Sequence, residues 1–76
     1  MRKQSIQYSS PLDALVEVTK RLSYHETSEH MDSEEFFHRY SQGQLSDDAE
    51  HVEWANYYRH YLCLRQELAK KLKNAA

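Results

Sequence analysis

Residues 46–74 read S-D-D-A-E-H-V-E-W-A-N-Y-Y-R-H-Y-L-C-L-R-Q-E-L-A-K-K-L-K-N, with neither glycine nor proline. The acids at the start and the lysines at the end complement a helix dipole, so we expect one long helix over residues 47–73, capped by Ser46 or Asp47. Its apolar residues recur at helical spacing in two neighbouring stripes, which together are broader than the apolar face of an ordinary surface helix. The first stripe is Trp54, Tyr57, Tyr61, Leu64 and Leu68, and the second is Ala55, Tyr58, Leu62, Ala69 and Leu72.

A first helix is predicted upstream, over residues 11–24. Ser10 can accept hydrogen bonds from the free amides of the first turn, and Pro11 suits the first helical position. The apolar positions that follow at helical spacing are Leu15, Val18 and Leu22. We expect this helix to end where the strong helix formers give out.

A short second helix is predicted over residues 33–42. Asp32 as the cap, with Glu35 three residues later, is an acidic variant of the capping box. Gly43 then supplies the left-handed residue that commonly ends a helix. A helix of this length does not persist without tertiary packing.

The chain is thus predicted to be an all-α protein of three helices, with residues 1–9 as a flexible arm and residues 10–76 as one small domain. A chain of 76 residues buries only about 60% of its unfolded surface, so it needs additional stabilisation. Cys63 is the only cysteine, which excludes an internal disulfide. We therefore expect assembly into an oligomeric helical bundle.

A single thiol and no apolar signal segment are typical of a reducing cytoplasm, and no apolar run could span a bilayer. Charge is segregated along the chain: residues 26–53 hold nine acids and one base, whereas residues 54–76 hold five bases and one acid. This distribution favours self-pairing or an acidic patch for a basic partner. The alternative is that acids simply collect at helix N-termini.

The broad aromatic face of the third helix predicts a small, non-catalytic, self-associating interaction protein that needs no cofactor. Tyrosine and tryptophan are enriched at interface hot spots because each combines a large area with a polar tip. The expected interface residues are Trp54, Tyr57, Tyr58, Tyr61, Leu64 and Leu68.

Two other functions are alternatives. A DNA-binding regulator could present a dimeric basic surface to phosphates, although the pI of about 6.2 is low for that class. The residues that would serve this role are Arg59, Arg65, Lys70, Lys71 and Lys73. A weaker alternative is a metal-binding helical dimer, because Glu35 and His38 have the E-x-x-H spacing of carboxylate-bridged metal sites, and Asp47 or Asp48 has similar spacing to His51.

The segment E-E-F-F-H-R-Y-S-Q-G-Q-L-S-D-D at residues 34–48 and E-W-A-N-Y-Y at residues 53–58 resemble a group of short bacterial proteins common in cyanobacteria. That group shares an E-F-x-x-R-Y-x-x-G-x-L-x-D-D pattern followed by E-W-A-x-x-Y. Some of its members resemble the antitoxin-like partners encoded beside toxin genes. The resemblance covers about residues 31–70 and implies a partner-binding helical protein of regulatory or adaptor type, with no catalytic residues.

Overall fold

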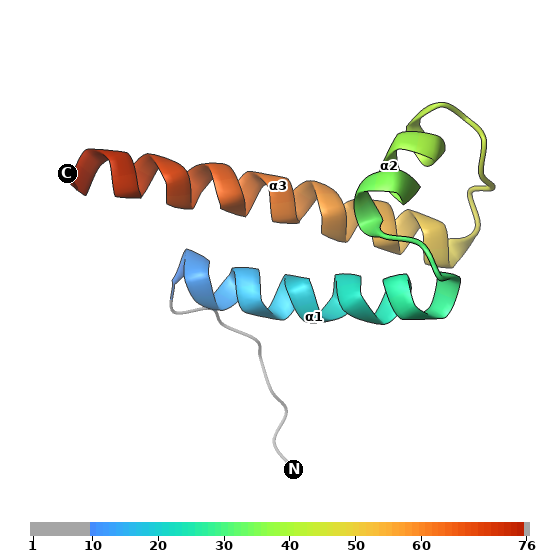
Figure 1. Cartoon of the computed structure of the whole chain (residues 1–76), viewed down its shortest axis with the longest axis horizontal. Helices are drawn as coiled ribbons and strands as arrows, with labels where there is room; N and C mark the ends of the chain where they lie inside the picture. The colour runs from blue at the N-terminus through green and yellow to red at the C-terminus, as the bar shows by residue number, and fades with distance from the viewer. Residues whose placement is uncertain (1–9, 76) are drawn as a thin grey trace, which may run out of the picture.

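The computed structural model describes residues 10–75, which form three α-helices joined by short loops (Figure 1). They are α1 (Pro11–Glu29), α2 (Ser33–Ser41) and α3 (Ala49–Ala75). The prediction of an all-α fold with three helices and a long C-terminal helix is confirmed. The predicted arm over residues 1–9 lies outside the described residues.

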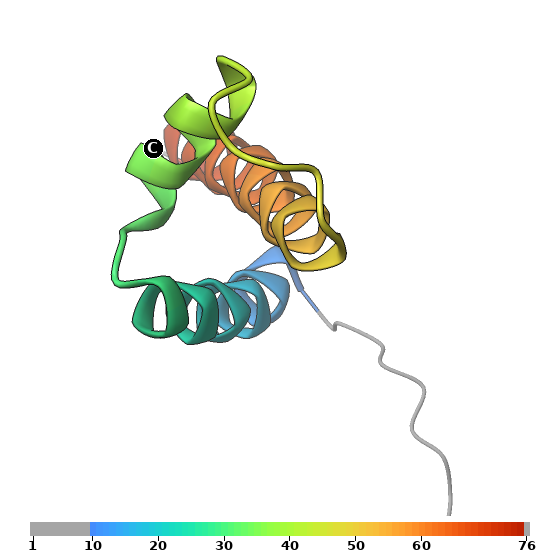
Figure 2. The same cartoon turned by 90° about the vertical axis from the view of Figure 1, so that its right-hand side faces the viewer.

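The helices α1 and α3 lie side by side and run antiparallel, and the short α2 packs beside the first half of α3 (Figures 1 and 2). In Figure 1 the C-terminal end of α3 extends beyond the start of α1. Within residues 10–75, no helix combines the length and apolar character needed to cross a membrane.

The helix α1 begins as predicted but ends later. The Ser10 hydroxyl accepts a hydrogen bond from the Asp13 amide at 3.2 Å. The predicted end near residue 24 is wrong, because α1 continues to Glu29 and stops at His30, which adopts a left-handed φ of 56°. The extra turn forms because His25 is buried at 3% exposure, and this tertiary packing outweighs the weak helix propensity of the segment.

Both ends of α2 are capped, which explains how so short a helix persists. At its start, the Asp32 carboxylate accepts a hydrogen bond from the Glu35 amide at 2.9 Å, as the capping box predicted. Glu26 reaches across from α1 and accepts a second hydrogen bond, from the Ser33 amide, also at 2.9 Å. At its end, Gly43 takes a φ of 76°, which confirms its predicted role as a left-handed stop.

The helix α3 begins at Ala49, two residues later than predicted, and its cap is Asp48 rather than Ser46 or Asp47. The Asp48 carboxylate accepts a hydrogen bond from the His51 amide at 3.0 Å. This hydrogen bond lowers the pKa of Asp48 below its ordinary value of 3.8, because it favours the charged carboxylate.

The core is centred on Trp54, whose side chain is 1% exposed. Its indole ring stacks on Phe36 of α2, with ring centroids 3.8 Å apart, and on His25 of α1 at 5.4 Å. The indole N–H donates a buried hydrogen bond to the Ser33 hydroxyl at 2.8 Å. Trp54 therefore joins all three helices. The other buried apolar residues are Ala14, Val18, Leu22, Ala55 and Leu64.

Replacing Ser33 with alanine should lower the free energy of unfolding by about 1–3 kcal/mol, because the buried indole N–H loses its acceptor. Urea unfolding followed by fluorescence measures this effect directly, since Trp54 is the chain's only tryptophan. The exposed Ser28→Ala is the control and should change stability by no more than about 0.5 kcal/mol. Equal effects of the two variants at one protein concentration would contradict the assigned hydrogen bond.

Replacing Asp48 with alanine should lower the melting temperature at neutral pH. The folded pKa of Asp48 is depressed, so its contribution is present above the unfolded pKa and is lost as pH falls through the folded pKa. The difference in melting temperature between wild type and Asp48→Ala should therefore narrow as pH falls below 3.8. Thermal unfolding measured by circular dichroism tests this. A gap of constant size across that range would show that Asp48 does not stabilise the helix through its charge.

Candidate protein-interaction surface

The structure divides the six predicted interface residues into two groups. Trp54 and Leu64 belong to the core of the single chain, at 1% and 6% exposure, so the prediction that they face a partner is corrected. The remaining four are half-buried; they are Tyr57, Tyr58, Tyr61 and Leu68. The chain therefore covers more of its own aromatic face than the sequence indicated.

Exposed large apolar residues lie on α1, at Leu12, Val16 and Tyr24, and on α3, where two of them belong to the other predicted stripe. Tyr58, Leu62, Ala69 and Leu72 follow one another along the helix, and we call them the open stripe. Leu62 is 36% exposed, Leu72 is 74% exposed and Ala69 is also exposed. Because α2 spans only nine residues and lies beside the first half of α3, it leaves the part of the stripe beyond Tyr58 uncovered (Figure 1).

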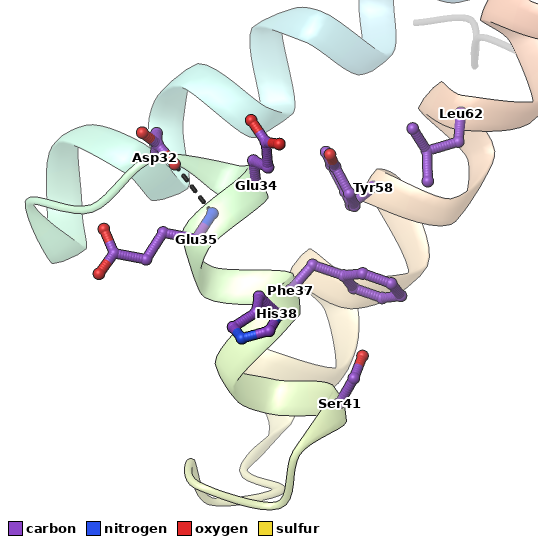
Figure 3. A pocket seen from close by; sticks show the side chains of 8 residues that line it. All are labelled: Asp32, Glu34, Glu35, Phe37, His38, Ser41, Tyr58 and Leu62. Atoms are coloured by element: carbon purple, nitrogen blue, oxygen red, sulfur yellow. Dashed lines mark hydrogen bonds between the residues drawn. The ribbon is translucent and has the colours of Figure 1, made fainter.

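A groove between α2 and α3 lies at one end of the open stripe (Figure 3). Its apolar part is formed by Phe37, Tyr58 and Leu62, and the Phe37 and Tyr58 rings lie 5.1 Å apart. Figure 3 shows Phe37 extending from α2 toward α3, whereas Glu35 turns away from the aromatic rings. The polar residues that line the groove are Asp32, Glu34, Glu35, His38 and Ser41. A second hollow farther along α3 is lined by Leu62, Arg65, Gln66 and Ala69.

The N-terminal end of α2 gives this groove an acidic rim. Asp32 and Glu35 are engaged locally, Asp32 in the helix cap and Glu35 in an ion pair with Arg39 at 2.6 Å. Glu34 makes no ion pair with any residue between 10 and 75. Burial raises the pKa of Tyr58 above its ordinary value of 10.0, and the nearby Glu34 carboxylate raises it further. Glu34 is thus an unpaired negative charge beside the apolar groove.

The basic residues proposed for DNA binding are exposed but do not share one face of α3. Arg59 lies over the Phe37 ring at 5.4 Å and donates a hydrogen bond to Asn56, whereas Arg65 lies over the Tyr61 ring at 5.7 Å. The two arginines are six positions apart, which places them about 120° apart around the helix. Lys70, Lys71 and Lys73 lie near the C-terminal end of α3 and form no ion pair within the described part of the chain. These residues do not form the continuous basic stripe that phosphate binding favours.

Asp48 and His51, two of the residues considered as metal ligands, have other contacts. Asp48, His51 and Ser46 meet where α3 begins: the Ser46 hydroxyl donates to Asp48 at 3.1 Å, and His51 Nδ1 lies 2.9 Å from the Ser46 carbonyl oxygen. These are the contacts of a helix cap. Between residues 10 and 75, no three His, Cys, Asp or Glu side chains converge as metal ligands.

A scan against protein-family models finds no match, and neither a search of curated proteins nor a search of solved structures finds one.

The interface prediction did not include Phe37, which lines the groove, or Leu62, Ala69 and Leu72, which belong to the open stripe. The last three were recognised as an apolar stripe, and their spacing was a sufficient signal for that. The sequence could not show which of the two stripes α1 would cover. Phe37 was missed because the groove that it lines depends on how α2 lies against α3.

Proposed function

We propose that this chain is a small, non-catalytic interaction module that docks helical protein surfaces through the open stripe and the adjoining groove. The observation that supports this proposal is the exposure of Leu62 and Leu72 on one broad face of α3, beginning at the groove that Phe37 and Tyr58 form. In a recurring mode of protein recognition, an amphipathic helix of the partner lays its apolar face in such a groove, with its anchoring side chains at helical spacing.

The proposed biological role is that of a regulatory or adaptor protein, of the antitoxin-like type that the sequence resemblance implies. The open form of the groove supports binding rather than chemistry, since catalytic sites hold the reacting groups away from bulk water. The short α2 and the exposed apolar face on the second half of α3 support a surface that becomes covered when the protein meets its partner. A chain this small also gains stability when such a surface is buried.

Site-specific photo-cross-linking in cells that produce the chain tests this function. Benzoylphenylalanine in place of Gln66, which borders the open stripe, should yield covalent adducts with a polypeptide. The matched control carries the same group in place of Glu67, which is exposed on the same helix but points about 100° farther from the stripe.

Adducts at position 66 well in excess of those at position 67 are the expected result, whether the captured polypeptide is a second copy or another protein. Equal yields at the two positions would contradict the proposed function, because the open stripe would then be no more engaged than an arbitrary helix surface.

A further inference from the structure

The open stripe joins two regions of opposite charge. At its Tyr58 end lies the start of α2, where Glu26, Asp32, Glu34 and Glu35 gather. At its Leu72 end, the last turns of α3 carry three lysines. Opposite charges at the two ends of one apolar surface favour a partner with the same arrangement in the reverse direction. A second copy of this chain, turned end for end, has that arrangement.

We propose that the occupant of the open stripe is the α3 helix of a second copy, packed antiparallel about a twofold axis that passes between Arg65 and Gln66. This inference rests on the proposed function and specifies its partner. In this register Leu62 of one copy faces Ala69 of the other, so a large side chain meets a small one. Tyr58 lies opposite the last turn that contains Leu72 and Lys73.

The electrostatics favour the antiparallel direction over the parallel one. In the antiparallel pair, Lys73 of each copy comes beside Glu34 of the other, and neither residue has an ion-pair partner among residues 10–75 of its own chain. The two helix dipoles also oppose each other, which is favourable. A parallel pair would instead bring the lysine-rich ends together. Like charges held side by side oppose such an arrangement.

The groups near the twofold axis are compatible with this pairing. Arg65 leans over the Tyr61 ring of its own chain, with its guanidinium carbon 5.7 Å from the ring centroid, so the two symmetry-related arginines are directed away from each other. Gln66 is uncharged, and with Leu62 and Ala69 it lines the hollow at the centre of the stripe. An isologous interface of this kind closes on itself and yields a dimer rather than a fibre.

Sedimentation equilibrium tests whether the partner is a second copy, because it measures the affinity of dimer formation for each variant. Leu72→Glu should weaken dimer formation at least about tenfold, because the twofold axis makes each substitution count twice. Val16→Glu is the matched control: Val16 is an exposed aliphatic residue on α1, at 48% exposure, and its substitution should leave dimerisation unchanged. Leu72 is 74% exposed, so its substitution leaves the folded monomer intact, which circular dichroism checks.

The charge pair is tested by reversal. Glu34→Lys and Lys73→Glu should each weaken the dimer by about threefold or more at low salt, and the two together should restore most of the lost affinity. The proposed register would be overturned if the double variant lost as much dimer affinity as the two single variants lose together.

Disulfide trapping tests the direction of the helices. In a Cys63→Ser background, Leu62→Cys and Ala69→Cys are introduced into one chain. The two cysteines cannot form a disulfide within one chain. They lie seven positions apart on the helix, so their Cα atoms are about 10.5 Å apart, beyond the ~7 Å limit for a disulfide. Trypsin cuts after Arg65, so the two cysteines fall in different peptides and mass spectrometry identifies the linkage.

A crosslink between positions 62 and 69 is the expected result, and crosslinks of 62 with 62 and of 69 with 69 would overturn the antiparallel arrangement while leaving the interaction function intact. A chain that stays monomeric at tens of micromolar, yet forms adducts with another protein at position 66, would overturn the second copy as the partner. Monomeric behaviour together with no excess of adducts at position 66 would overturn both proposals.

Discussion

The stacking of Trp54 on aromatic rings of two different helices is the constraint on which the rest of the structure depends. Phe36 of α2 and His25 of α1 both stack on the indole, and the Ser33 hydroxyl accepts a hydrogen bond from its N–H. Removing a buried tryptophan side chain typically costs about 3–5 kcal/mol, a large share of the stability of a chain this small. One side chain on α3 thus packs against both of the other helices.

The uncovered surface follows from this arrangement. Because Phe36 and Ser33 hold α2 near Trp54, the nine residues of α2 cover only the beginning of α3. The helix α1 packs against the side of α3 that contains Leu64, whereas Leu62 and Leu72 stay exposed. The same packing that stabilises one end of the molecule leaves an apolar stripe along the other, with unpaired charge at each end.

The sequence predicted those parts of the fold that are set by local chemistry. Ser10, Asp32 and Gly43 have the capping roles that their residue types indicated, and the number and order of the helices were evident from the spacing of apolar residues. The cap of α3 was placed one or two residues early, because Ser46, Asp47 and Asp48 are all suitable caps and only the geometry chooses among them.

The parts that depend on tertiary contacts could not be predicted. The extension of α1 depends on the packing of His25 against Trp54, which lies 29 positions away in the sequence. The two apolar stripes of α3 overlap around the helix, and nothing in their spacing shows that Trp54 and Leu64 turn inward while Leu62 and Leu72 stay exposed. Of the residues predicted to form the interface, Trp54 and Leu64 are therefore buried in the core of the single chain, whereas the exposed Leu62 and Leu72 were not among them.

Amide hydrogen exchange across a range of protein concentrations tests most directly whether the open stripe of α3 is covered by association. Helical segments with few buried contacts open easily and exchange fast, and coverage slows their exchange. The amides of residues 62–73 should exchange fast at low micromolar concentration and become protected at tens of micromolar and above, whereas those of residues 51–57, beside the Trp54 core, should change little. Exchange of residues 62–73 that does not depend on concentration would contradict the proposed pairing of α3 with a second copy.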